Sequence, residues 1–368
     1  MKKKPGFLTR LLLIINYLFI LGMILAYLAS YINPEQFVFI AFFGLAYPVF
    51  ILGNLLFLIY WLLRGKRYLF LSLVIIVLGW NHFQRHFQFG GKRLDESSIN
   101  HIKVLSYNVQ NLSYSNYGQD KLIRDKMFYF LEQQEADIVC LQEFLIKARN
   151  SSEVIEGLKE ETGLPYLFYK NDNQESNSIQ GLLLFSKYPF INKGYVDMED
   201  NHISAIWTDM VIEKDTFRVY NIHYESIRLI GEDFKFVTDL PENTKSVQEI
   251  SEGSFNVLRK LSRAFKKRGA QVEIMHEHMK ISPYPVILCG DFNDTPSSYV
   301  YRTTRGDMKD AFIESGAGYN NTYAGKLPPL RIDYILCDPS LDIYDYKVDY
   351  DFRQSDHFPV TCTITLPN

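Results

Sequence analysis

Two long stretches without a charged residue, close to the start of the chain, most constrain how it can fold. Residues 11–30 and residues 37–63 contain no Asp, Glu, Lys or Arg. Each stretch is long enough for a helix that crosses a bilayer, which needs about 20 apolar residues. A third apolar run, residues 68–80, is shorter and fits a short span, a re-entrant segment or a buried helix. The sequence therefore predicts an all-helical membrane segment over residues 1–93 with about three transmembrane helices.

The basic residues of this segment predict its orientation. Residues 1–93 contain ten Lys and Arg but one acidic residue, Glu35. The basic residues gather before the first charge-free stretch and between the second stretch and the third run. Because short loops rich in Lys and Arg stay in the cytoplasm, we expect a multi-pass protein of the cell (inner) membrane. Everything after about residue 85 is then extracytoplasmic, in the periplasm, although Arg85, Lys92 and Arg93 argue against this orientation.

A cleaved signal peptide is the alternative explanation of the first stretch, which follows the basic start MKKK. The small-residue pattern of a cleavage site is not clear around Ala29, and a second long apolar stretch follows. These two observations favour a transmembrane helix that is retained over a signal peptide that is cleaved.

The remainder, residues 94–368, alternates short strands with helical patches. Residues 101–108, 121–136 and 137–143 are predicted to form a strand, an amphipathic helix and a strand. Residues 204–213 and 216–225 are predicted to form an antiparallel pair. Many strands with few helices indicate two sheets packed face to face with helices outside, an α/β sandwich rather than a Rossmann fold.

An insertion over residues 225–283 is predicted to be helical in its second half, with a basic face. Such a charged face is most often solvated. Contact with anionic lipid headgroups or with nucleic acid is the alternative.

The four cysteines all lie within or at the end of strand-like runs: Cys140, Cys289, Cys337 and Cys362. Their placement favours buried thiols. Their even number leaves disulfides of an oxidising compartment as the alternative. No CxxC spacing indicates zinc.

Polar residues stand at six predicted strand ends. In the run PYPVILCGDFN, a buried strand ends at Asp291, Phe292 and Asn293. Because successive side chains alternate faces, Asp291 and Asn293 point the same way. The complete set is Asn108, Glu143, His223, Asp291 with Asn293, Asp333, and Asp356 with His357. One such residue is commonly a turn former, but six convergent strand ends with carboxylates require a counter-charge, which a divalent cation supplies.

The kinds of side chain narrow the choice of metal and reaction. Carboxylates and amides without cysteine favour Mg²⁺, or Mn²⁺ or Ca²⁺, over zinc. Magnesium takes one or two protein carboxylates and leaves its other positions to water and substrate phosphate. The pattern therefore predicts chemistry on a phosphate ester.

The motifs SYNVQNL, CLQE, YNIHYES, GDFNDTP, RIDYIL and SDHFPV occur in this order. Together they resemble the endonuclease/exonuclease/phosphatase superfamily, over residues 101–368 but not over the membrane segment. The resemblance implies a DNase I-like four-layer α/β sandwich. It also implies a divalent-metal-dependent phosphoesterase that hydrolyses its substrate by attack of an activated water.

The resemblance further implies a metal site. Glu143 is the expected principal Mg²⁺ ligand, Asn108 assists it, and Asp356 lies near the metal.

Catalytic roles follow from the same resemblance. His357, oriented by Asp333, and His223 are expected to bracket the scissile phosphate. Asp291 is expected to orient or deprotonate the attacking water, and Asn293 to hold a phosphate oxygen.

The substrate stays open. Gln110 stands where abasic-site endonucleases of the family place an acidic metal ligand, which disfavours the DNA-repair branch. Residues 94–368 carry 29 basic and 41 acidic residues, a poor balance for general binding of duplex DNA. The expected partners are the lipid bilayer and a phosphate ester, either nucleic acid or a phospholipid headgroup. An inactive membrane-anchored binding or scaffold protein is the alternative, and it would be expected to lack some of these residues.

Overall fold

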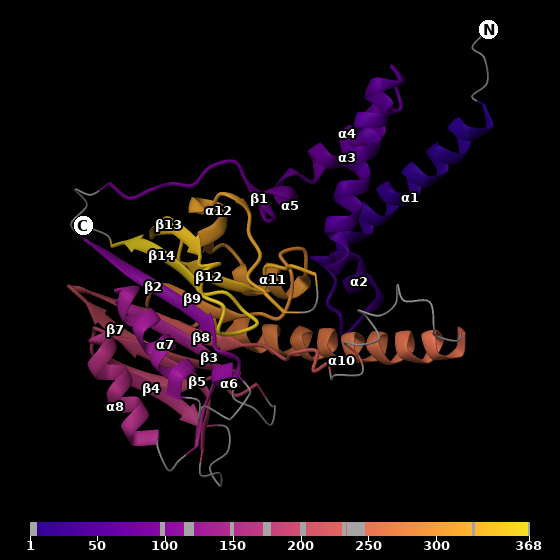
Figure 1. The fold of residues 1–368 in the computed structure, drawn as a ribbon. Coiled ribbons are helices and arrows are strands. Elements are labelled where there is room, and N and C mark those ends of the chain that lie inside the picture. Colours follow the sequence, from indigo (N-terminus) through magenta and orange to yellow (C-terminus); the bar gives the residue numbers. More distant parts are fainter. Residues whose placement is uncertain are drawn as a thin grey trace.

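The computed structural model describes nine parts of the 368-residue chain: residues 6–95, 100–113, 121–147, 151–171, 178–198, 204–229, 233, 247–325 and 328–366. Figure 1 shows a group of helices near the N-terminus and, beside it, a body of strands with helices on its outer faces.

The N-terminal part is built from apolar helices. They are α1 (Phe7–Ala29), α2 (Phe39–Leu45), α3 (Tyr47–Leu63), α4 (Leu69–Leu78) and α5 (Trp80–Gln84). Among the described residues, α1 is the one helix that by itself is long and apolar enough to cross a membrane. Helices α2 and α3 pass the same test only together, and α4 is shorter.

The second charge-free stretch forms two helices instead of one continuous span. Helices α2 and α3 meet at an angle of 59°. Pro48 lies in the first turn of α3. Proline has no N–H to donate and disfavours helical geometry in the residue before it, so a helix tends to end just before a proline and a new one begins there.

Buried polar side chains link these apolar helices. Asn16 Nδ2 donates to Ser72 Oγ at 2.8 Å, and Trp61 Nε1 donates to Asn16 Oδ1 at 3.0 Å. Asn54 Nδ2 donates to the carbonyl oxygen of Phe19 at 3.2 Å. These bonds join α1, α3 and α4, and they resemble the interhelical hydrogen bonds that hold helices together in lipid.

The body contains two six-stranded sheets. The first has the order β13-β14-β2-β3-β5-β4. Its strands are β2 (His101–Asn108), β3 (Ile138–Lys147), β4 (Tyr166–Asn171), β5 (Ser178–Ser186), β13 (Asp342–Val348) and β14 (Val360–Thr365). The second has the order β10-β12-β9-β8-β7-β6. Its strands are β6 (Phe190–Tyr195), β7 (Ala205–Ile212), β8 (Asp215–His223), β9 (Val286–Asp291), β10 (Lys309–Asp310) and β12 (Asp333–Cys337).

Helices cover the outer face of each sheet. Apolar residues of α7 (Lys121–Gln133) and α8 (Ser151–Thr162) pack on the first sheet. Those of α10 (Val247–Lys280) and α11 (Tyr299–Arg305) pack on the second. The inner faces of both sheets form one apolar core. The predicted four-layer α/β sandwich is therefore confirmed (Figure 1).

Several local predictions are confirmed. Strands β7 and β8 pair antiparallel, and β2 and β3 pair parallel across α7. The second half of the insertion is the helix α10, while residues 230–232 and 234–246 of that insertion lie outside the described chain. All four cysteines are free and buried between the sheets, as expected for buried thiols.

The helical part packs directly on the body. Ser30 Oγ donates to the carbonyl oxygen of Ser297 at 2.9 Å, and His86 Nε2 lies 2.9 Å from Ser297 Oγ. Arg85 Nη1 donates to the carbonyl oxygen of Pro296 at 3.4 Å. The short strand β1 (Phe87–Gln88) also pairs antiparallel with β11 (Gly318–Tyr319) of the body. The contacts with Pro296 and Ser297 reach the loop that follows β9, which carries part of the candidate site.

Candidate active site

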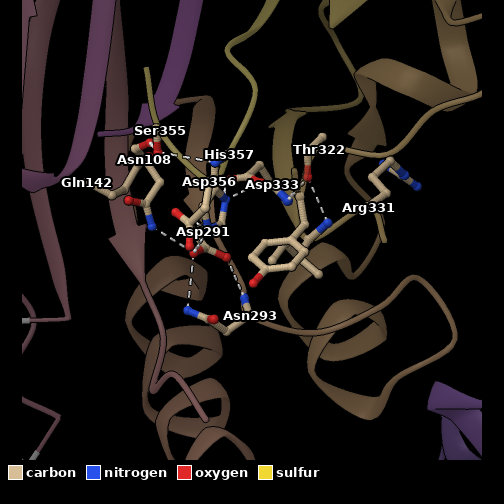
Figure 2. Close-up of polar contacts among 12 residues, drawn as sticks. Asn108, Gln142, Asp291, Asn293, Thr322, Arg331, Asp333, Ser355, Asp356 and His357 are labelled. Atoms are coloured by element: carbon tan, nitrogen blue, oxygen red, sulfur yellow. Dashed lines mark hydrogen bonds and ion pairs between the residues drawn. The ribbon is translucent and has the colours of Figure 1, made fainter. Parts of the chain in front are cut away.

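The sheets bring the predicted strand-end residues to one edge of the sandwich. In the second sheet His223, the last residue of β8, is the register partner of Asp291, the last residue of β9. Asp291 is in turn the register partner of Asp333, the first residue of β12. Because β12 runs antiparallel to β9, its start lies beside the end of β9. Figure 2 shows Asp291 and Asp333 in one cluster with His357 and Asn108.

Asn108 connects the two sheets at this edge. It is the last residue of β2, and its Nδ2 donates to Asp291 Oδ2 at 3.0 Å and to Glu143 Oε1 at 3.2 Å. Its Oδ1 accepts the backbone N–H of Gln110 at 3.0 Å. Ser355 Oγ donates to the Asn108 carbonyl oxygen at 2.8 Å, which links β2 to the segment before β14.

A β-bulge directs Glu143 into the cluster. The pairing of β3 with β5 shifts between Leu141 and Phe144, and Glu143 has a φ of 52°. A positive φ is uncommon for glutamate. Bulges turn side chains away from the ordinary alternation and recur beside active sites. The bulge therefore explains how a residue inside a strand reaches the edge.

Asn293 is held against Asp291. Its backbone N–H donates to Asp291 Oδ1 at 2.7 Å, and its Nδ2 donates to Asp291 Oδ2 at 3.2 Å and to the Tyr224 carbonyl oxygen at 3.0 Å. Its φ is 52°, a conformation that asparagine tolerates better than most residues. The two side chains thus lie together, as predicted, but a turn after the end of β9 at Asp291 brings them together instead of strand alternation.

Two histidines contact the same carboxylates. His357 Nδ1 lies 2.9 Å from Asp333 Oδ2, and its Nε2 lies 3.7 Å from Asp291 Oδ2 and 4.0 Å from Asp356 Oδ1. His223 Nε2 lies 3.2 Å from Glu143 Oε1 and 3.7 Å from Asp291 Oδ2. The described chain therefore places every predicted site residue in one continuous network of contacts.

Comparison with known proteins agrees with this geometry. Residues 105–357 match the model of the endonuclease/exonuclease/phosphatase family. The chain belongs to this family. Its members are typically metal-dependent phosphoesterases. Residues 9–86 match a family described only as a domain of unknown function (DUF8431). No curated protein matches the chain.

Solved structures are similar in fold. A humanized TDP2 of D. rerio is 14% identical, with a TM-score of 0.51 over 72% of this chain and 99% of that chain. A conserved protein of unknown function from Enterococcus faecalis is 17% identical, with a TM-score of 0.50 over 72% and 100%. A truncated TDP2 of Caenorhabditis elegans is 16% identical, with a TM-score of 0.50 over 72% and 98%. At these identities the likeness shows the fold alone.

The environment of this family fold drives the pKa values of two carboxyls apart. Burial and the nearby Asp333 charge raise the pKa of Asp291 to about 6, although His357 and His223 oppose the rise. Burial also opposes ionisation of Glu143, but contact with His223 and the charge of His357 outweigh it and lower its pKa to about 2. Carboxyls with such different pKa values can take different roles in one site.

The pKa values of both imidazoles are raised. Burial alone would lower the pKa of His357, but Asp333 and Asp291 outweigh it and raise the value to about 10. Burial likewise opposes protonation of His223, and Glu143 and Asp291 raise its pKa above the ordinary value. The site therefore favours a protonated His357 beside an anionic Glu143.

The residues present fit a hard divalent cation. Two overlapping groups bring their ligand atoms within 4.8 Å of one another: Glu143 with His223 and Asp291, and Asp291 with Asp333 and His357. Oxygen donors dominate both groups, as Mg²⁺ or Mn²⁺ prefers. Asn108 turns its Nδ2 toward the carboxylates, so ligation through Oδ1 requires rotation of that amide. Asp356 lies at the margin, with a side chain 29% exposed.

Several supporting residues were not predicted. Gln142, buried in β3, donates to Asn221 Oδ1 at 2.7 Å across the two sheets. Thr322 Oγ1 accepts the backbone N–H groups of Ile332 and Asp333, each at 3.0 Å. Gln142 lies within the CLQE motif, which could have indicated its role. Nothing in the local sequence distinguishes Thr322 from other threonines.

Proposed function

We propose that this chain is a membrane-anchored phosphodiesterase that uses a divalent cation, Mg²⁺ in the first place, and an activated water. The observation that carries the proposal is the position of Asp291. This buried carboxyl contacts the amide of Asn108 and faces the imidazoles of His357 and His223. A titratable base beside two imidazole donors suits in-line attack on a phosphate ester.

Glu143, assisted by Asn108 and with Asp356 at the margin, is the proposed holder of the cation. A bound cation supplies charge stabilisation to the phosphate oxygens and the leaving oxygen. Because the pKa of Glu143 is lowered to about 2, its carboxylate stays ionised throughout the neutral range. It is therefore ready to ligate without losing a proton.

Asp291 is the proposed base. A carboxyl with a pKa near 6 is ionised at neutral pH and is a stronger base than an ordinary aspartate. Asn293 holds it through two hydrogen bonds, so the carboxylate keeps a defined direction. We assign a phosphate oxygen to the Asn293 side chain, which requires that its amide exchange one of these bonds for the substrate.

His357 and His223 are the proposed donors to the phosphate oxygens. Asp333 contacts His357 through Nδ1, which leaves Nε2 directed at Asp291 and the site. Fixed cationic donors stabilise charge that develops in the transition state without reorganisation. Both a nucleic acid and a phospholipid headgroup offer the phosphodiester that this arrangement needs.

Metal-dependent hydrolysis tests the proposal. We expect the full chain to hydrolyse a model phosphodiester, EDTA to abolish turnover, and Mg²⁺ to restore it. Glu143→Gln is expected to raise the Mg²⁺ concentration for half-maximal rate by at least about tenfold. Loss of a residue that only supports a metal ligand already lowers metal affinity by about 10- to 100-fold. Parallel assays on a phosphomonoester, single-stranded DNA, RNA and phospholipid vesicles identify the branch. Absence of hydrolysis on all of them, in folded protein with metal, would favour the scaffold alternative.

A pH–rate profile tests the assignment of base and donor. We expect the rate to rise as Asp291 ionises, at or below a pH of about 6, and to fall as His357 loses its proton near pH 10. The Asp333 charge raises both pKa values, so Asp333→Asn is expected to move both limbs to lower pH. Asp351→Asn, on an exposed loop, serves as the control. If both limbs of the pH–rate profile stay at the same pH in Asp333→Asn, Asp291 and His357 are not the groups that set them.

We also propose that α1, α3 and α4 anchor the protein in a bilayer, with the body on the non-cytoplasmic side. Contacts of Asn16 with Trp61 and of Phe19 with Asn54 set α3 antiparallel to α1. The basic loop at residues 64–67 therefore lies at the end of the group near Arg10, opposite the body. That arrangement agrees with the positive-inside rule. A reporter at the C-terminus that is active only in the cytoplasm would overturn this orientation.

A further inference from the structure

Helix α10 does more than cover the second sheet. Its C-terminal half packs on the body through buried residues such as Val272 and Met275. Its N-terminal half extends beyond the body, alongside the end of the apolar helical group (orange in Figure 1). This N-terminal half carries exposed apolar and basic side chains that do not pack on the second sheet.

One face of α10 is directed toward the apolar helical group. Phe255, Leu258, Ser262, Phe265 and Gly269 recur at spacings of three and four residues, so they share one face. The ring of Phe265 meets that of Phe42 in α2 edge to face, with centroids 5.2 Å apart. Gly269 packs against the loop between α1 and α2, where a Cβ would come within 2.6 Å of Asn33 Oδ1.

The same face continues outward as exposed apolar surface. Phe255 is 66% exposed and Leu258 48% exposed. Since both residues lie on the face that contacts the α2 region further along the helix, they point toward the side from which the apolar helices extend. Exposed aromatic residues occur at the same end of those helices, among them Phe37, Phe39 and Trp80. Aromatic residues of this kind are typical of a membrane–water boundary.

Two cations lie beside this apolar face. Arg259 and Lys266 are exposed, and neither forms an ion pair within the described part of the chain. Arg259 donates to Asn256 Oδ1 at 3.2 Å. In contrast, the neighbouring cations Lys260, Lys267 and Arg268 form ion pairs with Asp233, Glu225 and Asp294. Arg259 and Lys266 therefore do not hold α10 to the described body through ion pairs.

We propose that the outer half of α10 is an interfacial helix that lies on an anionic phospholipid surface. Its apolar residues Phe255 and Leu258 enter the headgroup region, and Arg259 and Lys266 contact anionic headgroups. The inference goes beyond the proposed hydrolysis and rests on the proposed anchoring of α1, α3 and α4. Arg268 of the same helix pairs with Asp294, three residues after Asp291, so docking of α10 sets the height of the site above the lipid.

Site-specific fluorescence of the full chain in lipid nanodiscs tests this. The four native cysteines are buried, so an environment-sensitive label reacts at an introduced thiol. Leu258→Cys places the label on the proposed lipid face. Asn256→Cys is the matched control, because an exposed residue two positions away points about 200° around the helix. Leu56→Cys, exposed on α3, reports on the anchoring itself.

In nanodiscs with anionic lipid we expect brominated lipid to quench the label at position 258 at least about twofold more than at 256. In zwitterionic nanodiscs, or in the Arg259→Gln/Lys266→Gln variant, that difference is expected to shrink. Equal quenching at 258 and 256 with strong quenching at 56 would overturn the α10 proposal while the anchor stands. Lack of quenching at 56 would overturn the anchor. Protection of position 258 by a single-stranded oligonucleotide instead of lipid would overturn the lipid assignment in favour of nucleic acid. None of these readouts depends on hydrolysis.

Discussion

Asp291→Asn is expected to lower the rate of phosphodiester hydrolysis by about 10² to 10⁴-fold, the usual contribution of a general base. Asparagine has nearly the shape of aspartate but cannot accept the proton of the attacking water. Asp291 contacts His357, His223 and Asn108 at once, so no other described carboxyl occupies the same position. Steady-state kinetics with saturating Mg²⁺ measure the loss.

The fold is expected to survive this substitution. Burial raises the pKa of Asp291, so its ionised form is costly in the folded protein and removing the charge offsets disturbed hydrogen bonds. We expect the melting temperature to change by less than about 5 °C. Asp351→Asn should retain full activity. A rate close to that of the unaltered protein in Asp291→Asn would exclude Asp291 from the mechanism.

Removal of residues 1–93 is expected to destabilise the body and to abolish activity, although every proposed site residue is retained. The hydrogen bonds between the helical part and the body would be lost, among them four near the site: Ser30 to Ser297, His86 to Ser297, Arg85 to Pro296, and Arg331 to the Arg85 carbonyl oxygen. At about 0.5–1.5 kcal/mol each, they contribute about 2–6 kcal/mol. Typical domains have a free energy of unfolding of about 5–15 kcal/mol, so the loss is large.

The loss also reaches the site itself. Arg331 is buried, pairs with Asp310 at 2.9 Å and stands two residues before Asp333. Without Arg85 its Nη2 has lost the partner at 2.8 Å, and a buried donor without an acceptor is costly. Ser297 similarly belongs to the loop that begins at Asp291. The geometry of both acidic residues therefore depends on the helical part.

Thermal unfolding and kinetics of the truncated protein check this expectation. We expect its melting temperature to fall by at least about 5 °C. Co-expression of residues 1–95 with residues 96–368 provides the control, because a separate helical part can restore the same contacts. A truncated protein as stable and active as the full chain would show that residues 1–93 serve as an anchor alone.

The sequence predicted the arrangement of strand ends because it depends on local rules. Strand β9 ends at Asp291, as its sequence predicted, and the end of a strand in the sequence is also an end at the sheet edge. Asn293 lies beyond that end, where a turn and not strand alternation holds it against Asp291. The four-layer fold and the family could therefore be predicted from the sequence, and both predictions are confirmed. Helix α8 and strands β4 and β6 were not anticipated, since their patterns are weaker than those of the buried strands. The roles assigned to the site residues and the domain boundary stay predictions.

Tertiary structure decided what depends on distant parts of the chain. The bulge that turns Glu143 into the site arises from the pairing of β3 with β5, and Asn108 meets Asp291 across 183 positions. The bond of Ser30 to Ser297 spans 267 positions. By itself the sequence determined which polar side chains are available and that β2, β8 and β9 end in Asn108, His223 and Asp291, because side-chain type and strand pattern are local properties. It did not determine the end of β3, which continues past Glu143 to Lys147. Only the packing of the two sheets and the helical part determined which of those groups touch, because such contacts depend on the shape of the whole core.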